Sequence, residues 1–203
     1  MTTSFGIRKS GDAMSPRNPL LAEMDGLTLL KRDHDSLRIL FSLFREEDEL
    51  EKKERLADEI IKELCIHTSE KLLYPLAERF LFNGSAFVKE HLDQHSKLER
   101  AMSDVMYIKP LDPYFDDKMR FIMDNAEAHF KEEEERLFAR LHDNVKRDVL
   151  LTMSYKIQKA RINAPTRPHP NMPKRGVLGK WATRLAATMD SVADSLTTRV
   201  TAQ

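Results

Sequence analysis

The chain has 203 residues, of which 41% are hydrophobic and 33% charged, enough for a buried core and a well-solvated surface. Basic and acidic residues both number 33, so the overall charge favours neither a nucleic acid nor an acidic substrate, and we expect no nucleic-acid partner. The single cysteine, Cys65, excludes an internal disulfide framework and indicates a reducing, cytoplasmic location. No apolar run approaches the roughly 18 residues of a membrane span.

The N-terminal segment, residues 1–24, is polar and lacks the apolar core of a secretory signal. It is mildly basic and rich in hydroxyl side chains, so two interpretations stand. One is a flexible tail and the other is an organelle transit peptide. We predict the flexible tail.

Four apolar stripes at helical spacing follow within residues 25–145. The first comprises Leu27, Leu30, His34, Leu37, Phe41 and Phe44, and the second comprises Leu56, Ile60, Leu64, His67, Glu70 and Tyr74. The third comprises Val88, His91, Leu92, His95, Leu98, Met102 and Val105, and the fourth comprises Met119, Ile122, Met123, Ala126, His129, Glu133, Leu137 and Leu141. Each stripe has polar neighbours and therefore predicts an amphipathic helix.

Residues typical of helix starts lie between the stripes and support this division. Ser85 is expected to cap the third helix, and Asp112 a fourth helix that begins at Pro113. The chain has six glycines and no sustained alternation, so strands are not expected. The prediction is an all-α fold: an antiparallel up-down-up-down four-helix bundle with a C-terminal helical extension.

The apolar stripes contain an unexpected set of polar side chains. Seven residues form it: His34, His67, Glu70, His91, His95, His129 and Glu133. One histidine on an apolar face is usually a satisfied core residue, but burying five of them with two carboxylates costs several kcal/mol in total unless something pairs with them. A bound cation would pair with them, and the set therefore predicts a metal site.

The spacing of these residues indicates how they would share a metal. His91 and His95 lie one helical turn apart on one face, as do His129 and Glu133. Imidazole suits iron, zinc, copper or nickel, and a carboxylate can bridge two ions. Seven candidate ligands exceed the needs of one ion, so we predict two. The neighbouring Glu132, Glu134 and Glu135 lie off the stripe and are expected on a solvated face.

Four segments of the chain resemble the helices of the hemerythrin-like, HHE cation-binding domains. They read "LLKRDHDSLRIL", "ELCIHTSEKLLYPLAE", "KEHLDQHSKLERAM" and "AHFKEEEERLFARL". The resemblance covers about residues 25–145 and implies a four-helix bundle around two non-haem iron ions. It implies that His34, His67, His95, His129 and Glu133 are iron ligands, and that His91 matches the additional histidine of oxygen-carrying members.

The second segment departs from that family. Its His67 and Glu70 stand three residues apart, where the family has an acid four residues after the histidine. Glu70 can still share a helix face with His67, and Glu63, four residues before His67, is the reserve candidate. We therefore predict that the second ion is held more weakly.

The sequence leaves three functions open, of which the resemblance implies the first two. The first is a protein that binds or senses dioxygen or iron, with dioxygen or a related small molecule as its partner. The second is a peroxidase, catalase-like or nitric-oxide-handling enzyme at the same centre. The third is a metal-free helical interaction module.

The rest of the chain predicts an extension of the bundle. Residues 146–163 predict a further helix, and 164–176, with four prolines, predict an extended linker. Residues 177–203 predict an amphipathic helix with Trp181 on its apolar side. That helix would dock on its own bundle or on another subunit, or it would lie on a membrane surface. A disordered segment is the third interpretation.

Overall fold

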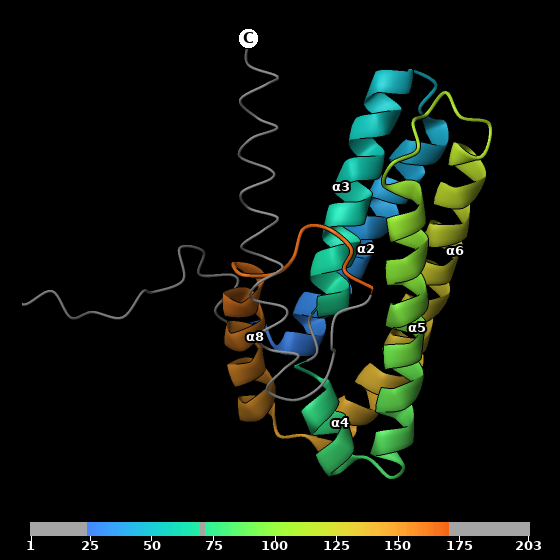
Figure 1. Ribbon diagram of the computed structural model, residues 1–203. Helices are drawn as coiled ribbons and strands as arrows, with labels where there is room; N and C mark the ends of the chain where they lie inside the picture. Colours follow the sequence, from blue (N-terminus) through green and yellow to red (C-terminus); the bar gives the residue numbers. More distant parts are fainter. Residues whose placement is uncertain (1–23, 70–71, 171–203) are drawn as a thin grey trace, which may run out of the picture.

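Helices make up all the regular structure that the protein shows. The computed structural model describes residues 24–69 and 72–170, and within these ranges no strand occurs, which confirms the predicted all-α fold. Figure 1 shows four long helices lying side by side: α2 (Gly26–Glu46), α3 (Leu50–Ser69), α5 (Gly84–Val105) and α6 (Phe115–Glu132). Contacts join α2 to α3, α3 to α5, α5 to α6 and α6 to α2, so the four helices close a ring.

Shorter helices complete the described structure. They are α4 (Tyr74–Phe80), the π-helix η1 (Glu133–Phe138), α7 (Ala139–Asn144) and α8 (Arg147–Arg161). The π-helix continues α6 without a break, and α7 continues the π-helix. Helix α4 packs against α5 and α7, while α8 packs against α2 (Figure 1).

Helix starts show where the sequence-based boundaries hold and where they fail. Helix α2 begins after Asp25, whose carboxylate accepts hydrogen bonds from the backbone N–H groups of Leu27 and Thr28. Helix α5 begins at Gly84 after Asn83, so the prediction that Ser85 is the cap was wrong. Helix α6 begins at Phe115, two residues beyond the predicted start.

The second predicted helix is divided in the structure. The described residues of α3 end at Ser69, and a separate helix, α4, begins at Tyr74 with Pro75 in its first turn. Proline favours this position because its missing N–H has no partner to lose there. The single stripe that we drew through His67 and Tyr74 was therefore wrong. The predicted ligand Glu70 lies outside the described residues.

Two apolar clusters fill the interior, one on each side of the histidines. One cluster includes Leu30 of α2, Leu92 of α5 and Leu137 of the π-helix. The other includes Leu37 of α2, Leu98 of α5 and Phe130 of α6. On α2, His34 lies between the two clusters, and His95 takes the corresponding position on α5. The polar side chains therefore form a layer in the middle of the core.

The structure describes only part of the C-terminal segment for which predictions were made. Helix α8 lies within the predicted 146–163 helix, and its Met153 and Ile157 are buried. Residues 164–170 of the predicted linker contain no helix, and Pro165 among them is buried. The predicted helix over 177–203 and nearly all of the predicted tail over 1–24 lie outside the described residues.

Candidate metal centre

Six of the seven predicted ligands are described, and all six are buried. They are His34, His67, His91, His95, His129 and Glu133, and none is more than 6% exposed. They come from α2, α3, α5, α6 and the first residue of the π-helix. The structure therefore gathers residues nearly one hundred positions apart into one layer.

Glu133 lies at the centre of this layer. Its carboxylate approaches three histidines: Oε2 lies 3.4 Å from Nε2 of His34 and 3.8 Å from Nε2 of His67, and Oε1 lies 3.5 Å from Nε2 of His129. One potential ligand atom from each of His67, His95, His129 and Glu133 falls within 4.8 Å of the others. These four can reach a shared ion, with His34 beside them on the same carboxylate.

His95 and His129 point ring nitrogens at each other. Their Nε2 atoms lie 2.9 Å apart. The other nitrogen of His129, Nδ1, lies 2.6 Å from Oε1 of Gln94, an oxygen that can only accept a hydrogen bond. His129 must therefore carry its proton on Nδ1, and its Nε2 lone pair faces the interior of the layer. This is the tautomer that a metal ligand needs.

His34 is oriented in the same way from the opposite side. Its Nδ1 lies 2.8 Å from Oε1 of Glu134, which also pairs with Arg38 at 3.0 Å. In the neutral imidazole, donation to this carboxylate leaves the Nε2 lone pair of His34 on the side of Glu133. The ring of His34 also stacks on Phe130, with 4.1 Å between centroids.

His91 sits at the edge of the layer. Its ring centroid lies 5.4 Å from that of His129, and it also contacts the rings of Phe87 and Tyr74. It does not belong to the four residues whose ligand atoms converge. The structure therefore places His91 next to the cluster rather than inside it.

Unpaired atoms in the layer show that it fits a metal. Among the described residues, His34 Nε2, both ring nitrogens of His67 and of His91, and Glu133 Oε2 are buried and make no hydrogen bond. Leaving such groups unsatisfied costs about 1–3 kcal/mol each. A divalent transition metal bound by these nitrogens and oxygens would remove that cost.

The protonation states also suit a metal site. Burial lowers the pKa of His67 well below its usual range and that of His129 to about 4, even though the charge of Glu133 opposes both changes. Burial would raise the pKa of Glu133, but His129, His34 and His67 outweigh it and hold that pKa well below its usual range. Near neutral pH, the imidazoles of His67 and His129 are therefore neutral and the carboxylate of Glu133 is ionised.

Sequence reasoning missed two residues that contact the predicted ligands. Glu134 was expected on a solvated face but hydrogen-bonds to His34, and Gln94 was not singled out. Gln94 is itself held by Glu132, which accepts hydrogen bonds from its amide and from Arg136. Glu135 is exposed, as expected. No signal in the sequence pointed to Gln94, because its contact with His129 depends on which helices are neighbours.

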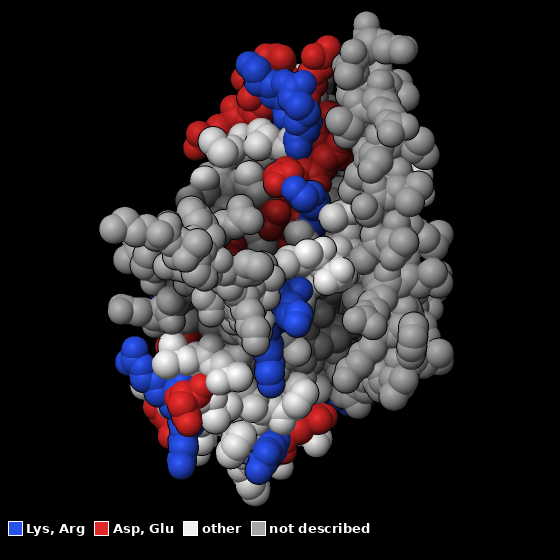
Figure 2. All heavy atoms as spheres, turned by 90° about the vertical axis from the view of Figure 1, so that its left-hand side faces the viewer, with Lys and Arg blue, Asp and Glu red and all other residues white. Residues whose placement is uncertain are grey.

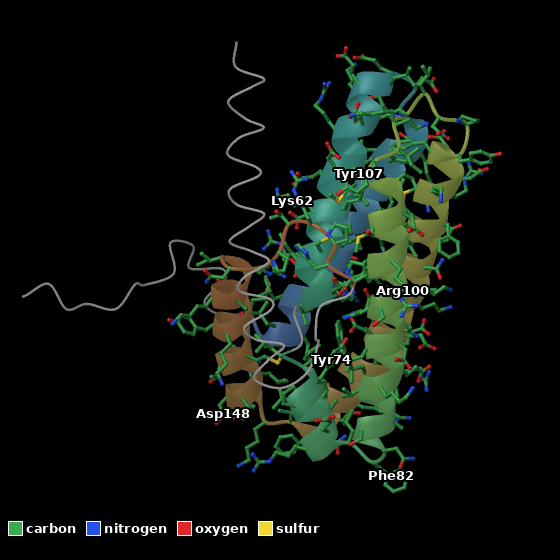
Figure 3. The ribbon with its side chains drawn as sticks, viewed as in Figure 1. Lys62, Tyr74, Phe82, Arg100, Tyr107 and Asp148 are labelled. Carbon is green, nitrogen blue, oxygen red and sulfur yellow. The ribbon has the colours of Figure 1, made fainter. Side chains whose placement is uncertain are left out.

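Tyr74 completes the layer on the α4 side. Its hydroxyl lies 3.3 Å from both ring nitrogens of His95, and Figure 3 shows the residue between α4 and α5. Burial raises the pKa of this phenol well above its usual range, so the hydroxyl keeps its proton. The phenol is therefore a neutral group that can donate a hydrogen bond to His95.

Comparison with known proteins adds two relatives. A "DNA nickase" of Nostoc sp. is 28% identical over 125 residues, which cover 61% of this chain but only 35% of that protein. An uncharacterised hemerythrin-like protein of Schizosaccharomyces pombe is 20% identical over 168 residues, 81% of this chain and 83% of that protein. No solved structure matches the chain.

The family model of the hemerythrin HHE cation-binding domain matches residues 25–141. That range runs from the cap of α2 to α7 and includes every candidate ligand. The family and the buried His/Glu cluster together indicate metal binding. The chain belongs to the hemerythrin HHE cation-binding domain family.

Proposed function

We propose that the protein holds two non-haem iron ions in this His/Glu layer and uses them to bind or sense dioxygen or iron. The observation that carries the proposal is the set of buried nitrogens and oxygens without a hydrogen bond, contributed by His34, His67, His91 and Glu133. Iron is the metal that the family typically binds. When bound, it would supply a redox-active centre with affinity for dioxygen and related small molecules.

The chain's own residues prepare such a centre from two sides. Arg38 and Glu134 orient His34 from the α2 side, and Gln94 with Glu132 orients His129 from the α5 side. Both contacts fix the tautomer that turns Nε2 inward. The ligands are therefore positioned before a metal arrives, which reduces the ordering that binding would require.

The surrounding fold supports the same function. We interpret the four side-by-side helices as an antiparallel up-down-up-down bundle, the arrangement in which facing helices can build a metal site in the core. The two apolar clusters flank the polar layer and keep water away from it on the two sides that they cover. A reactive small molecule held there would be shielded from solvent. Among the described residues, no helix is both long and apolar enough to cross a membrane.

A peroxidase, catalase-like or nitric-oxide-handling enzyme at the same centre is the second candidate. Its supporting observation is the protonated hydroxyl of Tyr74 beside His95, a buried group that can donate a hydrogen bond within the layer. Steady-state peroxide turnover would distinguish an enzyme from a binding protein, and Tyr74→Phe should lower that turnover. Nicking of DNA is a property of the Nostoc protein, and the match covers 35% of it.

Metal analysis with optical spectroscopy tests the main proposal. Protein purified after iron-replete expression should contain iron, and its absorption in air should differ from that under reduction. Folded protein without metal would favour the interaction module instead.

A further inference from the structure

A surface pocket opens between α2 and α3 and reaches the metal layer. Its volume is about 370 Å³. The described residues that line it come from α2, α3 and the end of α8: Asp33, Ser36, Leu37, Ile39, Leu40, Glu59, Glu63, Ile66, His67 and Arg161. Among these residues are the predicted metal ligand His67 and the reserve candidate Glu63.

His67 gives this pocket a connection to the centre. The side chain is 6% exposed, and neither ring nitrogen makes a hydrogen bond among the described residues. Its Nε2 lies 3.8 Å from Oε2 of Glu133. A cation that entered the pocket would therefore meet an unpaired imidazole directly next to the central carboxylate.

The charged groups of the pocket favour a cation. Asp33 is neutralised by Arg161, which holds both of its carboxylate oxygens. Glu59 and Glu63 remain, one turn apart on α3, with Lys62 at 3.1 Å from Glu59 and 3.9 Å from Glu63. Lys62 projects from the outer side of α3 in Figure 3, so an incoming cation can displace it. With Asp33 paired to Arg161, the two glutamates outnumber Lys62 and leave an excess of negative charge, which raises the local concentration of cations.

A second groove on the described part of the chain lacks this combination. A groove along α5, about 440 Å³ in volume, has two lysines and two acids in its lining and reaches the centre only through Gln94. Figure 2 shows the α8 side of the molecule, where acidic and basic side chains of the described residues are interspersed.

We propose that the pocket between α2 and α3 is the entrance through which a divalent cation reaches His67, with Glu59 and Glu63 attracting it. This inference rests on the proposed metal-binding function. The two glutamates act on the rate of loading, because they attract the ion without remaining bound to it. The amount of metal held at equilibrium is set by the buried ligands instead.

The test measures how fast metal-free full-length protein takes up Co²⁺, a surrogate for Fe²⁺ whose absorption changes on binding nitrogen and oxygen ligands. Glu59→Gln with Glu63→Gln should slow uptake by about tenfold at low ionic strength, with an unchanged final amount of bound Co²⁺. The difference should shrink at high salt, where the Debye length falls. Lys62→Gln, which removes the competing positive charge, should speed uptake.

The matched control is Glu49→Gln with Glu51→Gln. Both acids are exposed at the N-terminal end of α3, Glu49 directly before the helix and Glu51 in its first turn, roughly 15 Å away by helix rise. Their removal changes the net charge equally. Equal uptake rates for the two double variants would overturn the proposed entrance but not the proposed metal-binding function. A lower final amount of Co²⁺ in the pocket variant would also overturn it, since the glutamates would then be ligands. No Co²⁺ binding by the unmodified protein would overturn the proposed function itself.

Discussion

The imidazole Nδ1 of His34 lies 2.8 Å from the carboxylate of Glu134, and that carboxylate is held by Arg38 at 3.0 Å. This arrangement ties a buried candidate ligand to a charged pair near the surface. Glu134 follows directly after Glu133, whose carboxylate faces the same histidine from inside at 3.4 Å. Two consecutive acids thus contact opposite nitrogens of one ring, at the start of the π-helix.

Replacing Glu134 should weaken metal binding without removing a ligand. Glu134→Ala frees His34 to rotate or to change tautomer, and loss of such a contact typically costs 10–100-fold in metal affinity, or about 1–3 kcal/mol. Glu135→Ala is the control because that side chain is exposed. Competition with a chelator measures the affinity of each variant. Equal affinities for the two would show that Glu134 does not position His34.

The junction between α4 and α5 should not tolerate a side chain at Gly84. A Cβ atom there would lie 2.0 Å from the backbone oxygen of Ala77, and backbone cannot move aside as a flexible side chain can. Gly84→Ala should therefore lower the free energy of unfolding by at least about 2 kcal/mol, although alanine is the better helix former. Chemical denaturation measures this change, with Ser85→Ala as the exposed control. A variant as stable as the unmodified protein would contradict the close approach.

Acid should destabilise the metal-free protein. In the unfolded chain histidine titrates near pH 6.5, whereas burial lowers the pKa of His129 to about 4 and that of His67 well below its usual range. Between these values the unfolded state binds more protons, so the free energy of unfolding rises with pH. The contribution of His129, on the order of 3 kcal/mol, is fully present above pH 6.5 and is lost as the pH falls toward 4.

Glu133 acts in the same direction at lower pH. Its pKa is also depressed in the folded protein, so its contribution is present above pH 4.5 and is lost on further acidification. Thermal unfolding at pH 7 and pH 5 measures the histidine effect, and His129→Gln should show a smaller difference between the two. A midpoint that is unchanged or higher at pH 5 would contradict neutral burial of these imidazoles.

The candidate ligands on α2, α5 and α6 could be placed from the sequence because they lie within regular helical spacing. His34, His91, His95 and His129 all occupy stripe positions whose apolar members are buried in the structure. Periodicity fixes the face of a helix, and the face fixes which side chains meet in the core. The same reasoning failed beyond Ser69, where the stripe was continued into what is a separate helix. Pro75, in the first turn of α4, was the signal of that division.

The contacts behind the ligands could not be read from periodicity. Glu134 lies off the stripe, and its position depends on Arg38, which belongs to another helix and is distant in sequence. The π-helix that begins at Glu133 also departs from the regular α-helical spacing of side chains on which the prediction was based. Hydrogen bonds such as that of Gln94 to His129 depend on which helices are neighbours, and that is a property of the fold.

The iron content of the purified protein tests the central claim most directly. After iron-replete expression, elemental analysis should find about two iron ions per chain, since seven candidate ligands exceed the needs of one ion. Glu133→Ala should hold much less iron because its carboxylate approaches three of the histidines. Fully folded protein that contains only zinc, or no metal at all, would contradict the account.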